Sequence, residues 1–312
     1  MKTLLLFFCL FTALNTTAQN KQYYDWEWKP CNPEDARFVS LTDKTDSGWL
    51  RRDFYLSTKK SQMKGLYKDS ALKIKNGWFR YFYVNQVVSS QGNYVNGKKD
   101  GLWISNHFNG IIKEAAFYNA GYPTTIMAWH SQGLKSDSSV YHNDGTSTHT
   151  YWFDNGQLSH TGQSFSTKQD GKWQYYHKNG KLAAVEEYKA NELVSRVYYN
   201  ETGQLLSDTE SKDRPASFKG GPKKWRSFLL NNLDFLDGVK LVNTYFVTVV
   251  LALTIDEAGN ITDVYVDVPV SPKFDEQAIK VIKKSPAWIP AVDHNRNVKY
   301  HTRQSITFGQ VD

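Results

Sequence analysis

Regularly spaced tight turns are the feature that most constrains the fold of this chain. Turn-forming glycines recur at intervals of 13, 11, 12, 12, 11, 24 and 23 residues, at Gly97, Gly110, Gly121, Gly133, Gly145, Gly156, Gly180 and Gly203. Two units align closely, because Asp100-Gly101-Leu102-Trp103 leads to Asn109-Gly110 and Asp170-Gly171-Lys172-Trp173 leads to Asn179-Gly180. A turn about every 12 residues leaves room for a strand of seven or eight residues. The pattern predicts a long antiparallel meander in which each hairpin packs mainly on its neighbours.

The residues at and between the turns are those that a strand-and-turn repeat needs. Asn-Gly and Asp-Gly pairs supply the positive φ angles of tight hairpin turns. Runs such as Trp173-Gln174-Tyr175-Tyr176 and Val197-Tyr198-Tyr199 have the aromatic and β-branched content of strands. The 10 Trp and 19 Tyr are open to two interpretations, the core of a thin sheet or a face that stacks on sugars. The first is favoured, because a thin sheet has little else to bury.

The first 18 residues have the pattern of a secretory signal. Lys2 is followed by an apolar stretch, Leu4 to Leu14, and by small residues at Thr16-Thr17-Ala18. The apolar stretch is too short for a bilayer, which takes about 20 residues. Cys9 leaves with the signal and Cys31 stands alone, so neither an intramolecular disulfide nor a cysteine metal cluster is expected. We expect a periplasmic protein with a cleaved signal and no stable membrane span.

The last third of the chain has a mixed pattern of helices and strands. Two runs carry apolar residues at helical spacing, namely Trp225, Phe228, Leu229 and Leu233, and Phe274, Ala278, Val281 and Ile282. Tyr245 to Ile255 and Ile261 to Val268 predict a hairpin around the turn at Gly259-Asn260. The fold is therefore expected to be mainly β with a C-terminal α+β domain. An antiparallel repeat meander would precede two helices on a small antiparallel sheet.

The repeating units resemble the MORN-variant repeats, whose pattern is Gly-x-Trp, two aromatics, Asn-Gly, then a Tyr and another turn. The resemblance covers residues 65–206 and is good at Gly92 to Gly110 and at Gly171 to Tyr188. Such repeats imply a scaffold or an interaction surface and specify no ligand. Residues 19–64 would then be an N-terminal lead-in with short strands, and the polar residues 207–217 a linker.

Residues 218–308 resemble the C-terminal domain of the TonB energy-transducer family, so we place that domain at residues 218–312. The motifs that carry the resemblance are Gly259-Asn260-Ile261-Thr262-Asp263-Val264, Phe274-Asp275-Glu276-Gln277-Ala278, Pro286-Ala287-Trp288-Ile289-Pro290 and Ile306-Thr307-Phe308. In that family the domain binds a short extended segment of an outer-membrane receptor beside the exposed edge of its sheet. In such strand addition, main-chain hydrogen bonds give affinity and side-chain pockets give selectivity.

By similarity, the accepting edge is the last strand, from Val298 to Phe308. The resemblance implies that the partner-binding residues are Val298, Tyr300, Thr302, Gln304 and Ile306. The expected partner is an outer-membrane receptor segment or another envelope protein, with a link to TonB-dependent transport. Gln304→Pro is expected to remove a main-chain donor from the edge and abolish binding.

A second hypothesis is a repeat-based envelope scaffold with no transport role, whose C-terminal domain is a docking or dimerising cap. It stays open because the membrane helix and proline-rich spacer of the TonB family are not found before the domain. The segments Phe235-Leu236 and Gly238 to Asn243 also depart from the family pattern. Under this hypothesis, residues 19–206 alone would retain the partners.

Neither catalysis nor metal, cofactor or nucleic-acid binding is expected. The eight histidines form no His-Glu-x-x-His motif, and Glu186 and Glu187 would point to opposite faces of a strand. Gly162-Gln163-Ser164-Phe165-Ser166 lacks the closing glycine of a nucleophile elbow. The net charge of +7 is scattered along the chain, and no nucleic-acid-binding motif accompanies it. The oligomeric state is left open.

Overall fold

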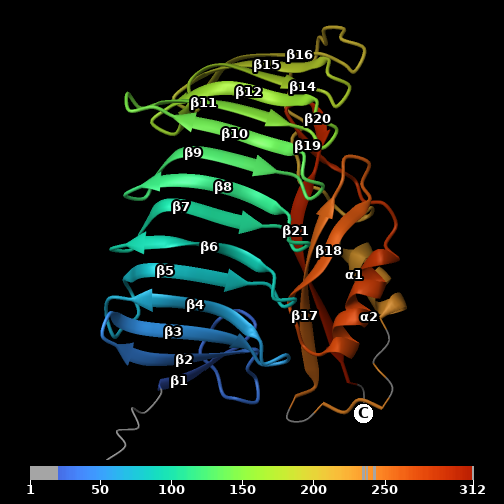
Figure 1. Ribbon diagram of the computed structural model, residues 1–312. Coiled ribbons are helices and arrows are strands. Elements are labelled where there is room, and N and C mark those ends of the chain that lie inside the picture. The colour runs from blue at the N-terminus through green and yellow to red at the C-terminus, as the bar shows by residue number, and fades with distance from the viewer. Residues whose placement is uncertain (1–19, 234–235, 237, 242–243, 311–312) are drawn as a thin grey trace, which may run out of the picture.

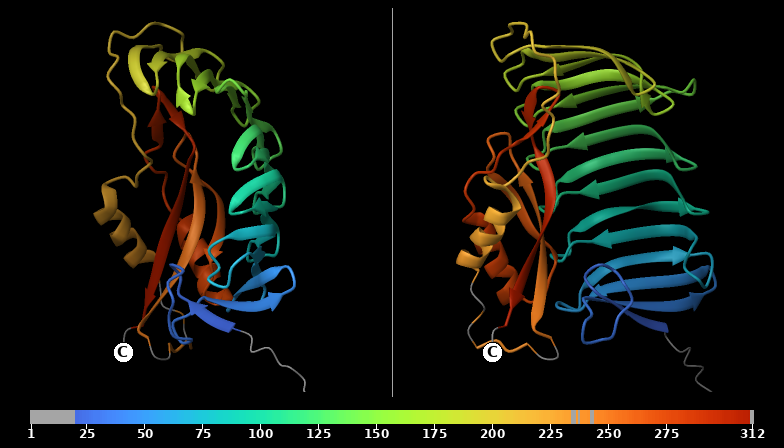
Figure 2. Two further views of the ribbon diagram at one scale, coloured as in Figure 1. Left: turned by 90° about the vertical axis from the view of Figure 1, so that its left-hand side faces the viewer. Right: turned by 180° about the vertical axis from the view of Figure 1, so that it is seen from behind.

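One long β-sheet forms the chain from residue 20 to residue 198. In the computed structural model, which describes residues 20–233, 236, 238–241 and 244–310, this is a 16-stranded sheet in chain order. Each strand pairs antiparallel with the next, except that the short β13 pairs with β12 beside the main path. Figure 1 shows the strands stacked from β1 to β16, and Figure 2 shows the stack bending into a crescent.

We call this sheet the meander. Its strands are β1 (Asn20–Tyr24), β2 (Phe38–Thr45), β3 (Gly48–Tyr55), β4 (Ser61–Tyr67), β5 (Lys75–Phe82), β6 (Val88–Val95), β7 (Lys98–Asn106), β8 (Ile112–Asn119), β9 (Tyr122–Trp129), β10 (Lys135–Tyr141), β11 (Thr146–Trp152), β12 (Leu158–Phe165), β13 (Lys168–Gln169), β14 (Gly171–Tyr176), β15 (Leu182–Lys189) and β16 (Glu192–Tyr198). The signal predicted at residues 1–18 lies outside the described residues. The sheet runs without a break through the boundary predicted at residue 64.

Turns along the side of the meander that faces the C-terminal domain share one geometry, which explains the sequence period. In the turn that begins at His107, its N–H donates to the Ile111 carbonyl and the Gly110 N–H donates back to His107, and the turn that begins at His177 repeats this pattern. The side-chain amide of Asn109 donates to a carbonyl of the next turn on the same side at 2.9 Å, as that of Asn179 does. The asparagine before the glycine therefore ties neighbouring repeats together.

Aromatic rings fill one face of the meander and need glycine beneath them. Trp103 and Trp173 are each 5% exposed. A Cβ atom at Gly92 would lie 2.3 Å from the Trp103 ring, and one at Gly162 would lie 2.2 Å from the Trp173 ring. Those distances are far below van der Waals contact, so the rings occupy the space that a side chain would need. Trp103 and Trp173 are therefore core residues, as the favoured interpretation expects, whereas Trp78 and Tyr122 are 52% and 72% exposed.

The C-terminal domain has two helices on a three-stranded antiparallel sheet. Its elements are α1 (Gly221–Asn232), β17 (Phe246–Ile255), β18 (Ile261–Val268), α2 (Pro272–Lys283), β19 (Ala291–Asp293), β20 (Arg296–Val298) and β21 (Tyr300–Gly309). The sheet order is β18-β17-β21, and β19 and β20 form a separate hairpin. A proline in the first turn begins each helix, where its missing N–H costs no hydrogen bond. The predicted fold is confirmed.

The domain lies along the meander, so its sheet packs on both faces. On the helix side, Leu251 and Leu253 share a core with the predicted apolar face of α2. On the other side, Val250 packs with Phe38 and Tyr55 of the meander. Figure 2 shows β21 running along the stack beside the crescent. The meander therefore holds one face of the sheet, and the helices hold the other.

Candidate functional site

The outer edge of β21 is the candidate functional site, and its register decides which main-chain groups face outward. β21 pairs with β17 over ten residue pairs without a shift, and the N–H of Gln310 continues the ladder by donating to the Tyr245 carbonyl at 2.9 Å. Main-chain groups alternate between the two sides of an antiparallel strand. Even-numbered residues of β21 therefore face β17. The outward groups belong to His301, Arg303, Ser305, Thr307 and Gly309.

This edge is open within the described part of the chain. There, no main-chain hydrogen bond joins the outward groups of β21 to another segment. The side chains of His301, Arg303, Ser305 and Thr307 are also exposed. The opposite edge strand, β18, is less regular, because its pairing with β17 shifts twice and Asp263 has a φ of 49°. Such irregularities discourage pairing with another strand, so β21 is the better template.

Of the residues proposed from the sequence, Tyr300, Thr302, Gln304 and Ile306 lie in β21, with different degrees of access. Val298 lies in β20, where it pairs with Ala291, so it is not part of this edge. Ile306 is 0% exposed, and Val298 and Tyr300 pack against the same core. Thr302 and Gln304 are half-buried. Because the N–H of Gln304 faces β17, Gln304→Pro would break the sheet rather than remove an outward donor. The pairing of β21 with β17 decides whether the odd or the even residues direct their main-chain groups outward. The sequence of β21 alone does not reveal this pairing.

One repeated position in the turns of the meander contacts the C-terminal domain. It is the residue that follows the opening residue of each turn on the domain side. The pairs are Phe108 with Tyr265 (ring centroids 4.6 Å apart), Ser131 with Asp263 (3.5 Å), Asp154 with Lys299 (2.7 Å) and Lys178 with Glu257 (3.3 Å). Sequence reasoning missed this position, because its residue type changes from turn to turn. Its constant offset from the Gly of the turn is the signal that could have found it.

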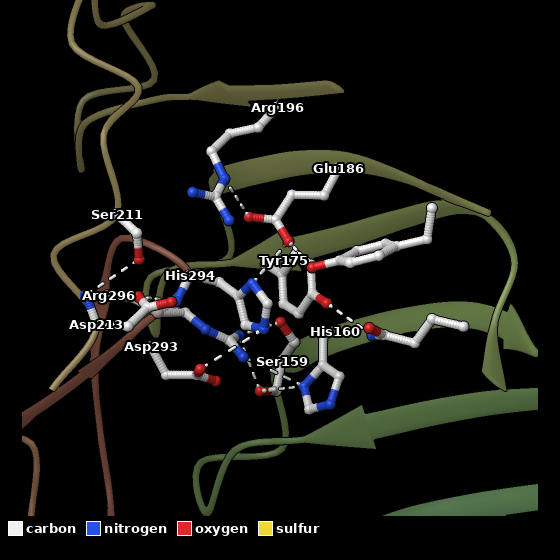
Figure 3. A network of polar contacts seen from close by, with 12 residues as sticks. Ser159, His160, Tyr175, Glu186, Arg196, Ser211, Asp213, Asp293, His294 and Arg296 are labelled. Carbon is white, nitrogen blue, oxygen red and sulfur yellow. Dashed lines mark hydrogen bonds and ion pairs between the residues drawn. The ribbon is translucent and has the colours of Figure 1, made fainter. Parts of the chain in front are cut away.

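The hairpin of β19 and β20 joins the domain to the last strands of the meander (Figure 3). Its turn residues His294 and Asn295 have φ angles of 49° and 62°. The next residue, Arg296, is 5% exposed. Its guanidinium donates to the main-chain carbonyls of Ser159 and Tyr176. We call this set of contacts the joint. The two carbonyl oxygens accept hydrogen bonds from Nη1, which offsets part of the cost of burying the guanidinium, while its Nε has no hydrogen-bond partner among the described residues.

A buried carboxylate completes the joint. Glu186 is 0% exposed and accepts hydrogen bonds from the Arg196 Nε at 3.0 Å and from the Tyr188 hydroxyl. The Nδ1 atom of His294 lies 2.8 Å from Glu186 Oε2, and the His294 ring stacks on Tyr175 with centroids 3.7 Å apart. Figure 3 shows Glu186 and Tyr175 of the meander and His294 of the hairpin pointing toward one another. The hairpin thus adds charge, hydrogen bonding and ring packing to one small region.

Burial and neighbouring charges shift the pKa values of Glu186, His160 and Asp154, which lie in or beside the joint. Burial alone would raise the pKa of Glu186, but hydrogen bonds from His294 and Tyr188 lower it overall. Burial, together with the charge of Arg296, lowers the pKa of His160 to about 2. Lys178 and Lys299 outweigh burial at Asp154 and lower its pKa to about 2. At neutral pH, Glu186 is therefore ionised and His160 is neutral.

A cavity of about 400 Å³ lies between the meander and the end of the sheet that carries His301. Its lining includes Phe108, Lys113, Glu114, Trp129, Tyr265 and His301. His301 Nδ1 lies 2.8 Å from the Thr254 hydroxyl. Although His301 is exposed at the edge, its ring is partly shielded from water at the cavity. This desolvation, with the charge of Lys113, lowers the pKa of His301, so the ring is neutral at neutral pH.

A second chain of polar side chains lies within the meander, on β10 and β11. His149 lies between the hydroxyls of Ser147, at 3.0 Å, and Ser139, at 2.9 Å, and Ser139 donates to Asp137 at 2.9 Å. Similar pairings activate hydroxyl nucleophiles in enzymes. Here Ser147 is 2% exposed, so its hydroxyl is not open to a substrate. Among the described residues, no group of three or more His, Cys, Asp or Glu is placed to hold a metal ion.

Neither helix in the described residues has the length and hydropathy needed to cross a membrane. Among solved structures, the crystal structure of TarM is 14% identical with a TM-score of 0.20, and the match covers 39% of this chain and 19% of that one. The crystal structure of TcdB2-TccC3-TEV is 10% identical with a TM-score of 0.17, covering 63% and 13%. The chain thus spans less than a fifth of either protein. No curated protein matches the chain.

Two family models match parts of the chain. Residues 169–190 match the MORN repeat variant, within the region where the sequence resembles such repeats. Residues 245–309 match the family described as Gram-negative bacterial TonB protein C-terminal, and this range contains all of β17, β18, α2 and β21. Both resemblances are confirmed. The chain therefore carries a TonB C-terminal domain, which indicates a TonB-like role in protein interaction at the cell envelope.

Proposed function

We propose that this protein binds an extended segment of an envelope protein by strand addition to the outer edge of β21. The observation that carries the proposal is the row of outward main-chain groups from His301 to Gly309, which have no main-chain partner among the described residues. An added strand would pair its own N–H and C=O groups with this row. An outer-membrane receptor segment is the expected partner, and binding one would link the protein to TonB-dependent transport in the periplasm.

The meander supports this function by holding the domain in one orientation. The joint and the repeated turn contacts attach the domain to the meander through β18, the hairpin of β19 and β20, and the Lys299 end of β21. The outward groups of β21 take no part in those contacts. Binding a strand at this edge would therefore leave the attachment of the domain intact.

Site-specific photo-crosslinking tests the proposal in cells that make the protein. A photoreactive residue at Arg303 is expected to capture one short segment of an envelope protein, identified by mass spectrometry. A photoreactive residue at Lys172, exposed on the strand β14 of the meander, is the matched control. Equal capture of many proteins at both positions would contradict the proposal.

The captured segment, made as a peptide, then allows a main-chain test. Ser305→Pro removes an outward N–H and is expected to weaken binding at least tenfold, since several ladder hydrogen bonds depend on strand pairing there. Ser305→Ala changes the side chain and keeps the N–H, so it should bind like the unaltered protein. Equal binding by the proline variant would rule out strand addition at this edge. If residues 19–206 alone still bind the peptide, the scaffold function is supported instead.

A further inference from the structure

We infer that the cavity beside His301 receives a large apolar or aromatic side chain of the segment that pairs with β21. This inference rests on the proposed function. It assigns the cavity between the meander and the C-terminal sheet as the pocket that selects the segment. The pocket is built jointly by turns of the meander and by the end of the sheet.

Strand geometry brings a partner side chain to this place. His301 is the outward-facing residue of β21 nearest to the joint, and its side chain lines the cavity. A residue directly opposite another in a sheet has its side chain on the same face, with Cβ atoms about 5 Å apart. The partner residue opposite His301 would therefore place its side chain beside the cavity.

The lining favours a bulky apolar group over a charged one. Four rings of Tyr, Phe and Trp line it, those of Tyr83, Phe108, Trp129 and Tyr265. Phe108 stacks on Tyr265 with an interplanar angle of 13°. Charges of both signs, at Lys113 and Glu114, lie at the same cavity, so neither sign of ligand charge is clearly preferred. A volume of about 400 Å³ is in the range of small-ligand pockets and would admit an aromatic side chain.

Indole and p-cresol, which correspond to the side chains of Trp and Tyr, test the cavity without any partner. We expect saturable shifts of the amide resonances of Phe108 and Tyr265 on titration of the full-length protein. Ala128→Trp is designed to fill the cavity and should weaken probe binding at least tenfold. Ala115→Trp places the same residue one strand away on the opposite face and should leave it unchanged. Ser136→Phe, also in the lining, replaces Ala128→Trp if that variant does not fold.

The crosslinked peptide separates this inference from the proposed function. Replacing its residue opposite His301 with alanine should weaken binding about 30-fold, as expected for a buried anchor. Ala128→Trp should weaken binding of the original peptide to a similar extent. If Ser305→Pro abolishes binding while Ala128→Trp has no effect, the cavity inference is wrong and strand addition stands. If the reverse holds, the cavity binds the partner and strand addition is wrong.

Discussion

Two neighbouring stretches of the C-terminal domain have opposite surroundings. In the hairpin from Ala291 to Val298, the turn residues are engaged by the meander through hydrogen bonds, ring stacking and charge. In β21, which follows at once, the outward main-chain groups have no main-chain partner among the described residues. The residues that attach the domain to the meander and the edge proposed to bind a partner strand are thus only a few positions apart in the chain. A domain attached to the meander through this hairpin, β18 and one face of its sheet can keep a regular, unpaired edge on β21.

Two arginines illustrate the difference. Arg296 in the hairpin is 5% exposed and meets carbonyl oxygens of the meander. Arg303 in β21 has a side chain that is 62% exposed and pairs with Asp267 at the surface. Burial makes the first contact costly to lose, because groups that were taken out of water would be left unpaired. Solvent screens the second, so its loss should cost little.

The largest expected effect is on the joint. Arg296→Ala should lower the free energy of unfolding by about 3 kcal/mol, since it leaves buried carbonyls of Ser159 and Tyr176 without a donor. Urea unfolding monitored by tryptophan fluorescence measures this loss. Arg303→Ala is the matched control and should change the same quantity by less than about 0.5 kcal/mol. Equal effects of the two substitutions would contradict the distinction between joint and edge.

Proline substitutions at adjacent positions sharpen the comparison within β21. Gln304→Pro removes an N–H that faces β17 and should lower the free energy of unfolding by about 2–3 kcal/mol. Ser305→Pro removes an outward N–H and should lower it by less than about 1 kcal/mol, because no ladder hydrogen bond is lost. Thermal unfolding followed by circular dichroism compares them. A reversed order would mean that the register of the edge is wrong.

The pH dependence of the joint gives a smaller effect. The pKa of His160 is about 2 in the folded protein and about 6.5 when unfolded, so the unfolded chain binds more protons below pH 6.5. The stability that neutral His160 contributes is fully present above pH 6.5 and is lost as the pH falls. Between pH 7.5 and 5.5, the stability difference between the unaltered protein and His160→Gln should shrink by about 1 kcal/mol. Chemical unfolding at both values measures it, and an unchanged difference would contradict a buried neutral ring.

The smallest effect is expected at the turn contacts with little burial. Ser131 reaches Asp263 over 3.5 Å at an exposed position, so Ser131→Ala should change the free energy of unfolding by less than about 0.5 kcal/mol. Phe108→Ala, one turn earlier, removes a ring stacked on Tyr265 and should cost about 2 kcal/mol. A double-mutant cycle with Tyr265 would isolate the ring contact. A larger loss for Ser131→Ala than for Phe108→Ala would overturn this ranking.

The sequence predicted what depends on local periodicity and missed what depends on distant partners. The spacing of glycines predicted the meander, and helical spacing around Phe274 predicted the buried face of α2. The strands β19 and β20 have three residues each, too few for a periodic signal. The contact of Arg296 with Ser159 spans 137 positions and has no local pattern. Whether the odd or the even residues of β21 face outward likewise depends on its register with β17, and the sequence of one strand does not reveal that register.

The most direct test of an open edge is amide hydrogen exchange along β21, measured by NMR on the full-length protein. Arg303, Ser305 and Thr307 should exchange rapidly, while Thr302, Gln304 and Ile306 should exchange slowly because their N–H groups bond to β17. Adding the crosslinked peptide should slow exchange at the odd-numbered positions and leave the even-numbered ones unchanged. Slow exchange at odd and even positions alike in the free protein would show that the edge is already paired and contradict the account.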